Sequence, residues 1–146
     1  MNRYLNTSLI VLAAIFSTAS MCNDDDDKNE NTDDTAFETS ISQGTWTVTY
    51  FFDKEDETSD FDGYSFKFND DGNATATKSS LSVPGSWDTE ESSDGNTKLY
   101  LDFGTASPLD ELNEDWIVVE FSSAKVTLEH VSGGDGETDS AILEKN

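Results

Sequence analysis

Few side chains in this sequence have the chemistry of a reactive or metal-binding group. The 146 residues contain one cysteine, Cys22, and one histidine, His130. Zinc and iron sites need several nitrogen or sulfur ligands, and Cys–His or Ser–His catalysis needs a nucleophile beside a base. We therefore expect no enzyme activity, no metal centre and no cofactor. His130 is in phase with Val126 and Leu128 near a predicted strand end, which favours a hydrogen-bonded histidine at the rim of the fold.

Acidic groups are the other candidate ligands. Six carboxylates lie within residues 53–62, and oxygen ligands of this kind can bind Ca²⁺ weakly. A solvated loop has the same composition, so the sequence leaves calcium binding open. The segment from Gly133 to Asp139 is similar to a glycine–aspartate calcium repeat but occurs once, which favours a hairpin loop. The sequence shows no acid in an apolar setting of the kind that glycoside hydrolysis requires.

The charge of the chain limits its partners. Aspartate and glutamate outnumber lysine and arginine by 31 to 8, and the formal net charge is −23 at pH 7. A charge of this size repels nucleic acids and anionic lipids and keeps a protein soluble and monomeric. We therefore expect a monomer with no nucleic-acid partner, and neutral or basic ligands.

Residues 1–21 have the three parts of a secretory signal peptide. Arg3 lies in a short polar start, residues 9–16 are apolar, and residues 17–20 are small or polar. Eight helical residues span only ~12 Å against a hydrocarbon layer of ~30 Å, so this segment is too short for a membrane-spanning anchor. We expect it to be removed.

The position of Cys22 directly after this leader resembles a bacterial lipoprotein signal, although Met21 stands where that signal has a small residue. The resemblance implies that Cys22 carries acyl chains such as palmitate and holds the protein on a membrane. The run from Asn23 to Asp27 resembles the acidic export signal of Bacteroidetes lipoproteins, which implies an outer membrane lipoprotein at the cell surface. The alternative is ordinary cleavage after Ala19, which gives a soluble periplasmic or secreted protein with a free thiol.

The rest of the chain divides into a tether and one domain. Residues 22–42 are rich in acids and amides and poor in apolar residues, which predicts a disordered tether behind the cysteine. In residues 43–146, apolar residues alternate with polar ones between recurring turn signals, and this pattern predicts an all-β domain. The predicted strands cover residues 45–52, 62–69, 73–79, 84–90, 97–103, 115–121, 124–130 and 138–144.

The connections between these strands indicate their order. Asp–Gly steps at Asp71-Gly72 and Asp94-Gly95 are typical of tight hairpin turns. We therefore predict a small antiparallel up-and-down eight-stranded β-barrel. One short helical turn is expected at 107–112, with Ser107 as its N-cap and Pro108 at its first position. This turn could plug one end of the barrel.

Several short motifs resemble the lipocalin-like domains of Bacteroidetes lipoproteins. They are Gly44-Thr45-Trp46, Phe66-Lys67-Phe68, Gly85-Ser86-Trp87, and the stretch from Leu109 to Leu112 that leads to Trp116. The resemblance covers nearly the whole domain and implies a barrel in which Gly44 and Trp46 are structural and Trp46 packs at the closed end. It implies no particular activity, and it leaves open whether Trp87 points inward.

A barrel of this kind suggests a non-enzymatic binding module for a small apolar ligand or a glycan. The apolar residues predicted to line its interior are Val48, Tyr50, Tyr64, Phe66, Leu99, Leu101, Val119 and Val126. Among them, Tyr50, Tyr64, Phe66 and Leu101 are the predicted ligand-binding residues, because a tyrosine buried in a barrel wall needs a partner for its hydroxyl group. The alternative is an accessory or scaffold lipoprotein of an envelope complex, with a filled barrel and no ligand.

The lipid anchor can be tested directly. If Cys22 is acylated, Cys22→Ala should move the protein from the membrane fraction to the soluble fraction, because the buried acyl chains contribute ~0.8 kcal/mol per CH₂ group. Metabolic labelling with a fatty acid should mark only the wild-type protein. Equal membrane association of the two proteins would show that the anchor prediction is wrong.

Overall fold

The structure is a computed structural model, and it describes residues 34–131 and 136–146. Four sequence predictions lie wholly or partly outside these residues: the signal peptide 1–21, the acylation site Cys22, the tether as far as residue 33, and the segment 133–135 of the predicted glycine-rich hairpin loop.

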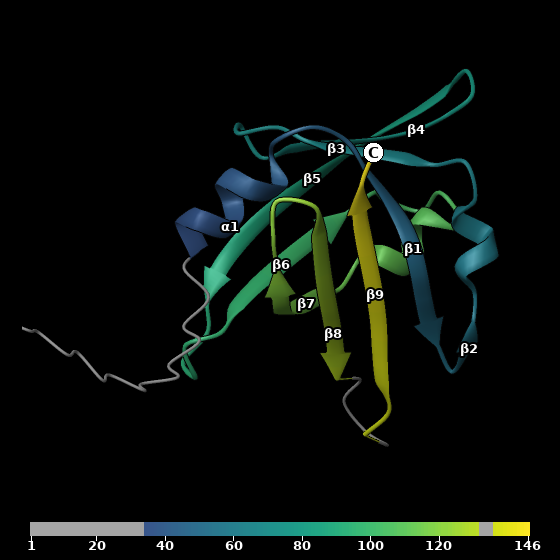
Figure 1. The fold of residues 1–146 in the computed structure, drawn as a ribbon. Helices are drawn as coiled ribbons and strands as arrows, with labels where there is room; N and C mark the ends of the chain where they lie inside the picture. Colours follow the sequence, from purple (N-terminus) through teal and green to yellow (C-terminus); the bar gives the residue numbers. More distant parts are fainter. Residues whose placement is uncertain (1–33, 132–135) are drawn as a thin grey trace, which may run out of the picture.

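Eight antiparallel strands form a closed barrel (Figure 1). They are β1 (Trp46–Asp53), β3 (Ser65–Phe68), β4 (Asn73–Lys78), β5 (Leu81–Glu91), β6 (Thr97–Asp102), β7 (Asp115–Phe121), β8 (Lys125–Val131) and β9 (Thr138–Lys145). Each strand pairs with the next one in the chain, and β9 pairs with β1 to close the sheet. A two-residue strand, β2 (Glu55–Asp56), also pairs with β1. The predicted up-and-down eight-stranded barrel is confirmed.

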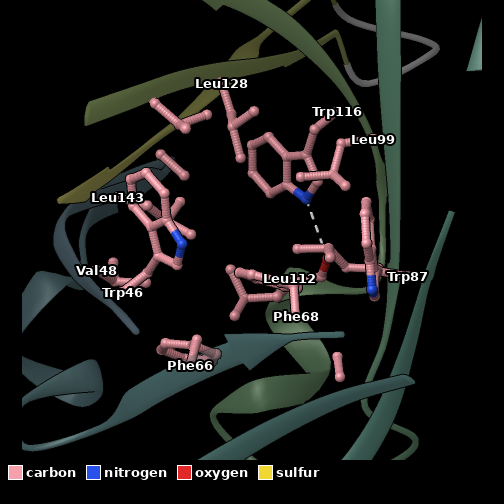
Figure 2. Packing of buried hydrophobic residues seen from close by; sticks show 14 of the residues in the cluster. Trp46, Val48, Phe66, Phe68, Trp87, Leu99, Leu112, Trp116, Leu128 and Leu143 are labelled. Carbon is pink, nitrogen blue, oxygen red and sulfur yellow. Dashed lines mark hydrogen bonds between the residues drawn. The ribbon is translucent and has the colours of Figure 1, made fainter. Parts of the chain in front are cut away.

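Alternation along the strands fills the barrel with side chains. In β6, for example, Leu99 and Leu101 are buried while Lys98 and Tyr100 are only half-buried. Figure 2 shows large apolar side chains from several strands converging on one interior. The largest fully buried side chains are Trp46, Trp116, Phe37, Phe51, Phe61, Phe66, Phe68, Ile41, Leu99, Leu109, Leu112 and Leu128.

A helix closes the end of the barrel at which β1 begins. Helix α1 (Asp34–Ile41) buries Phe37 and Ile41 completely, and the ring of Phe37 packs edge-on against Phe121 at 5.4 Å. Ser40 Oγ donates a hydrogen bond to the backbone oxygen of Ser122 at 2.9 Å. Trp46 is fully buried beneath this helix, and its Nε1 donates a hydrogen bond to the oxygen of Ile41 at 2.7 Å.

The predicted boundary between tether and domain is therefore wrong. Residues 34–42 were expected to belong to a disordered tether, but the folded part includes α1 and begins at or before Asp34. Phe37 and Ile41 are four residues apart and so lie on the same face of a helix, which allows both to enter the core. The average composition of residues 22–42 is polar, and it therefore does not reveal this apolar pair.

Two short 3₁₀ helices lie at the opposite end, where β1 ends and β7 begins. They are η1 (Thr58–Phe61) and η2 (Leu109–Leu112), and their residues Phe61, Leu109 and Leu112 are buried. The Nε1 of Trp116 donates a hydrogen bond to the oxygen of Leu112 at 3.0 Å (Figure 2). The predicted helical turn thus exists, but it begins one residue after Pro108, and no side chain caps it.

Two strand irregularities change which residues face the interior. The register of β1 shifts between Val48 and Tyr50, and that of β7 shifts between Val118 and Glu120. A β-bulge inserts one extra residue and so reverses the alternation beyond it. Tyr50 is therefore 37% exposed. Val119 is 46% exposed because it is out of phase with the buried residues Trp116 and Val118. The prediction that Tyr50 and Val119 line the interior is wrong.

The role of α1 in the fold can be measured. Phe37→Ala should lower the free energy of unfolding by about 3–5 kcal/mol, because it removes a fully buried ring from the core. The matched control, Thr39→Ala on the exposed face of α1, should change it by less than ~0.5 kcal/mol. Urea denaturation followed by tryptophan fluorescence gives both values. A loss below ~1 kcal/mol for Phe37→Ala would mean that this segment behaves as a tether.

Candidate functional site

Three of the residues predicted to bind a ligand lie in the buried core. Tyr64, Phe66 and Leu101 are buried, with Tyr64 only 6% exposed. The centroids of the Tyr64 and Phe66 rings lie 6.2 Å apart, and the Nζ of Lys78 lies 4.8 Å from the centroid of the Tyr64 ring. Phe66 also packs edge-on against Phe103 at 5.7 Å.

One hollow lies outside the barrel, between α1, the turn from β3 to β4, and β5. Its volume is about 410 Å³, which falls within the range of small-molecule sites. Its lining residues are Glu38, Thr39, Ser42, Gln43, Asp70, Gly72, Trp87, Asp88 and Thr89. Only Trp87 among them belongs to the buried core, so this hollow lies at the rim of the barrel.

A second hollow continues along the outer wall over β5 and β6. Its volume is about 590 Å³. It is lined by Asp71, Gly72, Ser86, Trp87, Asp88, Tyr100, Leu101 and Asp102. The two hollows share Gly72, Trp87 and Asp88 and are therefore adjacent; together we call them the Trp87 groove.

Trp87 connects the core to this surface. Its ring packs edge-on against Phe68 at 5.9 Å and is 8% exposed. Its Nε1 donates a hydrogen bond to the oxygen of Asn69 at 2.8 Å, and its backbone nitrogen donates one to the oxygen of Gly72 at 2.9 Å. These two bonds hold the β3–β4 turn against β5. The sequence left the orientation of Trp87 open, and the structure shows that it points inward.

Gly85, two residues before Trp87, lets the chain pack closely at this point. A Cβ atom on Gly85 would lie 2.5 Å from Cδ1 of Phe103 and 2.6 Å from the backbone oxygen of Asp102. These separations are too short for any other residue, so the absence of a side chain is a steric requirement. The Gly85-Ser86-Trp87 motif therefore shapes the wall beneath the second hollow.

The Trp87 groove is lined by negative charge. Five carboxylates contribute to it, those of Glu38, Asp70, Asp71, Asp88 and Asp102, and its lining includes no lysine. Hydrogen bonds from Asn73 hold the pKa of Asp71 below its usual value, which keeps this carboxylate ionised. The groove therefore offers hydrogen-bond acceptors and suits a neutral or positively charged ligand.

Tyr100 borders the same groove on β6. Its hydroxyl group donates a hydrogen bond to Oε2 of Glu90 at 3.0 Å. This hydrogen bond, followed by burial and the Glu90 charge, raises the pKa of Tyr100. The phenol therefore stays neutral, and its half-buried ring adds an aromatic surface beside the acidic one.

His130 lies at the other end of the barrel, as the sequence predicts for a rim histidine. Its Nδ1 is 3.1 Å from the backbone oxygen of Asp115, and its ring packs edge-on against Trp116 at 6.1 Å. The hydrogen bond from Lys98, at 2.7 Å, together with the Lys98 charge, lowers the pKa of Asp115. Among the described residues, Glu114, Asp115 and His130 place their ligand atoms within 4.8 Å of one another.

The acidic segment 53–62 is more ordered than its composition suggests. It contains the end of β1, all of β2 and the 3₁₀ helix η1. Hydrogen bonding from the Thr58 side chain, followed by the bond that the Thr58 backbone nitrogen donates to Asp56 Oδ1 at 3.1 Å, lowers the pKa of Asp56. Glu57 has a raised pKa because burial and the surrounding acids disfavour its charge.

These features define a small antiparallel barrel with a packed interior and a polar groove on its outer wall. The sequence matches no protein-family model and no curated protein. The structure is similar to the crystal structure of a DUF4847 family protein from Bacteroides vulgatus ATCC 8482, with a TM-score of 0.50 and 17% sequence identity. The match covers 75% of this chain and 97% of the other. At this identity, the likeness supports the barrel fold alone.

None of the helices in residues 34–131 and 136–146 is long and apolar enough to cross a membrane.

Proposed function

We propose that this protein is a non-enzymatic binding module, held on the outer membrane by lipid on Cys22 and displayed at the cell surface, that binds a glycan in the Trp87 groove. One observation carries the choice of site. The barrel interior is packed with buried side chains, whereas hollows of about 410 and 590 Å³ lie outside it and meet at Trp87. Ligand binding therefore belongs on the outer wall.

The chemistry of the groove favours a polar ligand over the apolar ligand expected for an open barrel. Carboxylates such as those of Asp70 and Asp88 accept hydrogen bonds, and the hydroxyl groups of a neutral glycan are donors. Tyr100 supplies an aromatic surface in the second hollow. An anionic ligand would be repelled by the five carboxylates, so a neutral glycan or one with amino groups fits best.

The proposed location depends on the sequence. Cys22 follows the apolar leader, and the acidic run from Asn23 to Asp27 has the position of a surface-export signal. The similarity in fold to a Bacteroides protein is consistent with a lipoprotein of the Bacteroidetes type. Because multiple acyl chains hold a small domain firmly on a bilayer, the groove would be displayed to extracellular glycans.

A second candidate is the scaffold role in an envelope complex. It is favoured by the same packed interior, and by the exposure of Tyr50 and Val119 on the outer wall. In that role, a partner protein would cover these side chains and the Trp87 groove would bind nothing. Glycan binding by the isolated protein therefore separates the two candidates.

The groove can be tested with a glycan array followed by calorimetric titration of the strongest glycan. Asp70→Ala combined with Asp88→Ala should weaken binding about tenfold, since each lost hydrogen bond is worth about 0.5–1.5 kcal/mol. The matched control combines Glu91→Ala with Asp94→Ala, which removes the same charge from exposed positions outside both hollows.

The control should bind like the wild-type protein. If the wild type binds no glycan, or if the two double variants bind equally well, the groove is not the site, and the scaffold role becomes the better account.

A further inference from the structure

The end of the barrel near the start of β7 carries a polar cluster that the proposed glycan site does not use. His130 lies near the end of β8, beside Glu114 and Asp115 at the start of β7. Its side chain is 16% exposed, so the imidazole is held by its surroundings while one edge stays accessible. None of these three residues lines either hollow of the Trp87 groove, although Tyr100, which borders the groove, pairs with Asp115 between β6 and β7.

Hydrogen bonding determines which imidazole nitrogen can act as a ligand. Nδ1 lies 3.1 Å from the backbone oxygen of Asp115 and 3.2 Å from its Oδ1. A carbonyl oxygen only accepts hydrogen bonds, so Nδ1 must carry the proton and donate it. In the neutral imidazole, Nε2 then keeps a lone pair that can bind a metal ion.

Asp115 is itself held in place from the other side. Its Oδ2 accepts a hydrogen bond from the Nζ of Lys98 at 2.7 Å, while its Oδ1 and backbone oxygen face the imidazole. A carboxylate or carbonyl behind the far nitrogen of a histidine is the usual support of a metal-binding imidazole, because it fixes the tautomer and the ring orientation. Asp115 therefore has the geometry of a positioning residue.

The two remaining donor atoms have the spacing of neighbouring metal ligands. Nε2 of His130 lies 3.6 Å from Oε2 of Glu114. Two ligand atoms that are each about 2.1 Å from a tetrahedral ion lie about 3.4 Å apart. A single ion could therefore contact both atoms with little movement of either side chain.

We propose that His130 Nε2 and the Glu114 carboxylate bind a divalent first-row transition-metal ion, with Asp115 orienting the imidazole. A nitrogen and an oxygen ligand suit Zn²⁺, Cu²⁺ or Ni²⁺ better than Ca²⁺ or Mg²⁺. Two protein ligands leave further coordination positions for water or for donor atoms of a bound molecule. The ion would join the connection after η2 to β8 at this end of the barrel.

The test uses Cu²⁺ as the probe, because it binds most tightly in the divalent series. His130 is the only histidine, so its imidazole signals in the NMR spectrum of the purified protein are unambiguous. Less than one equivalent of Cu²⁺ should broaden these signals before others. It should also quench the fluorescence of Trp116, because the centroid of that ring lies 6.1 Å from the centroid of the His130 ring. Both effects should weaken as the pH falls, because protons compete with the metal.

Three variants define the site in the same titration. His130→Gln should weaken Cu²⁺ binding at least tenfold, and Glu114→Gln should weaken it several-fold. The matched control is Glu129→Gln, which removes one exposed charge from the position beside His130 on β8 and should leave binding unchanged. The proposal is overturned if the imidazole signals do not change during quenching, if His130→Gln binds like the wild-type protein, or if Glu114→Gln has no larger effect than Glu129→Gln.

Discussion

Trp46 is the residue on which the closure of the barrel depends. It is the point at which β1 pairs with both of its neighbours, opposite Phe66 of β3 on one side and Lys145 of β9 on the other. Its Nε1 also binds the last carbonyl oxygen of α1, that of Ile41. One fully buried indole therefore joins the two edges of the sheet to the helix that covers its end. A burial of this kind leaves no unpaired donor, because the single N–H group finds an acceptor.

This closure has a functional consequence. With α1 at one end and η1 and η2 at the other, aromatic and leucine side chains occupy the interior. An eight-stranded barrel has an interior just wide enough to be filled by side chains or to hold one small ligand, and here buried side chains occupy it. In the described residues, the two candidate sites are consequently on the outside: the Trp87 groove and the cluster around His130. They come near each other where Tyr100 of β6 pairs with Asp115 of β7.

The sequence was most informative where alternation was regular. Strands such as 115–121 were predicted with correct bounds, and Trp46 was correctly expected in the core, because each pattern depends on local periodicity. The bulges next to Tyr50 and Val119 could not be predicted from local periodicity. A bulge is an extra residue relative to the strand with which it pairs, and that pairing is not visible in the sequence.

The candidate sites were harder to predict for a related reason. The Trp87 groove combines side chains from α1, a hairpin turn and two strands, so no short motif contains it. The cluster at His130 likewise needs the pairing of β7 with β8. For α1 the sequence does contain a signal: the spacing of Phe37 and Ile41 indicates a helix with an apolar face within a polar segment.

A filled barrel interior places ligand binding outside the barrel. The most direct measurement is a titration of a solvatochromic lipid probe into the purified protein, with Leu128→Trp as the comparison, since this change adds bulk to the interior at a residue that lines neither hollow. We expect no saturable fluorescence change at micromolar protein for either chain. A saturable one-to-one change with the wild-type protein that is lost in Leu128→Trp would show an internal ligand site and contradict a filled interior.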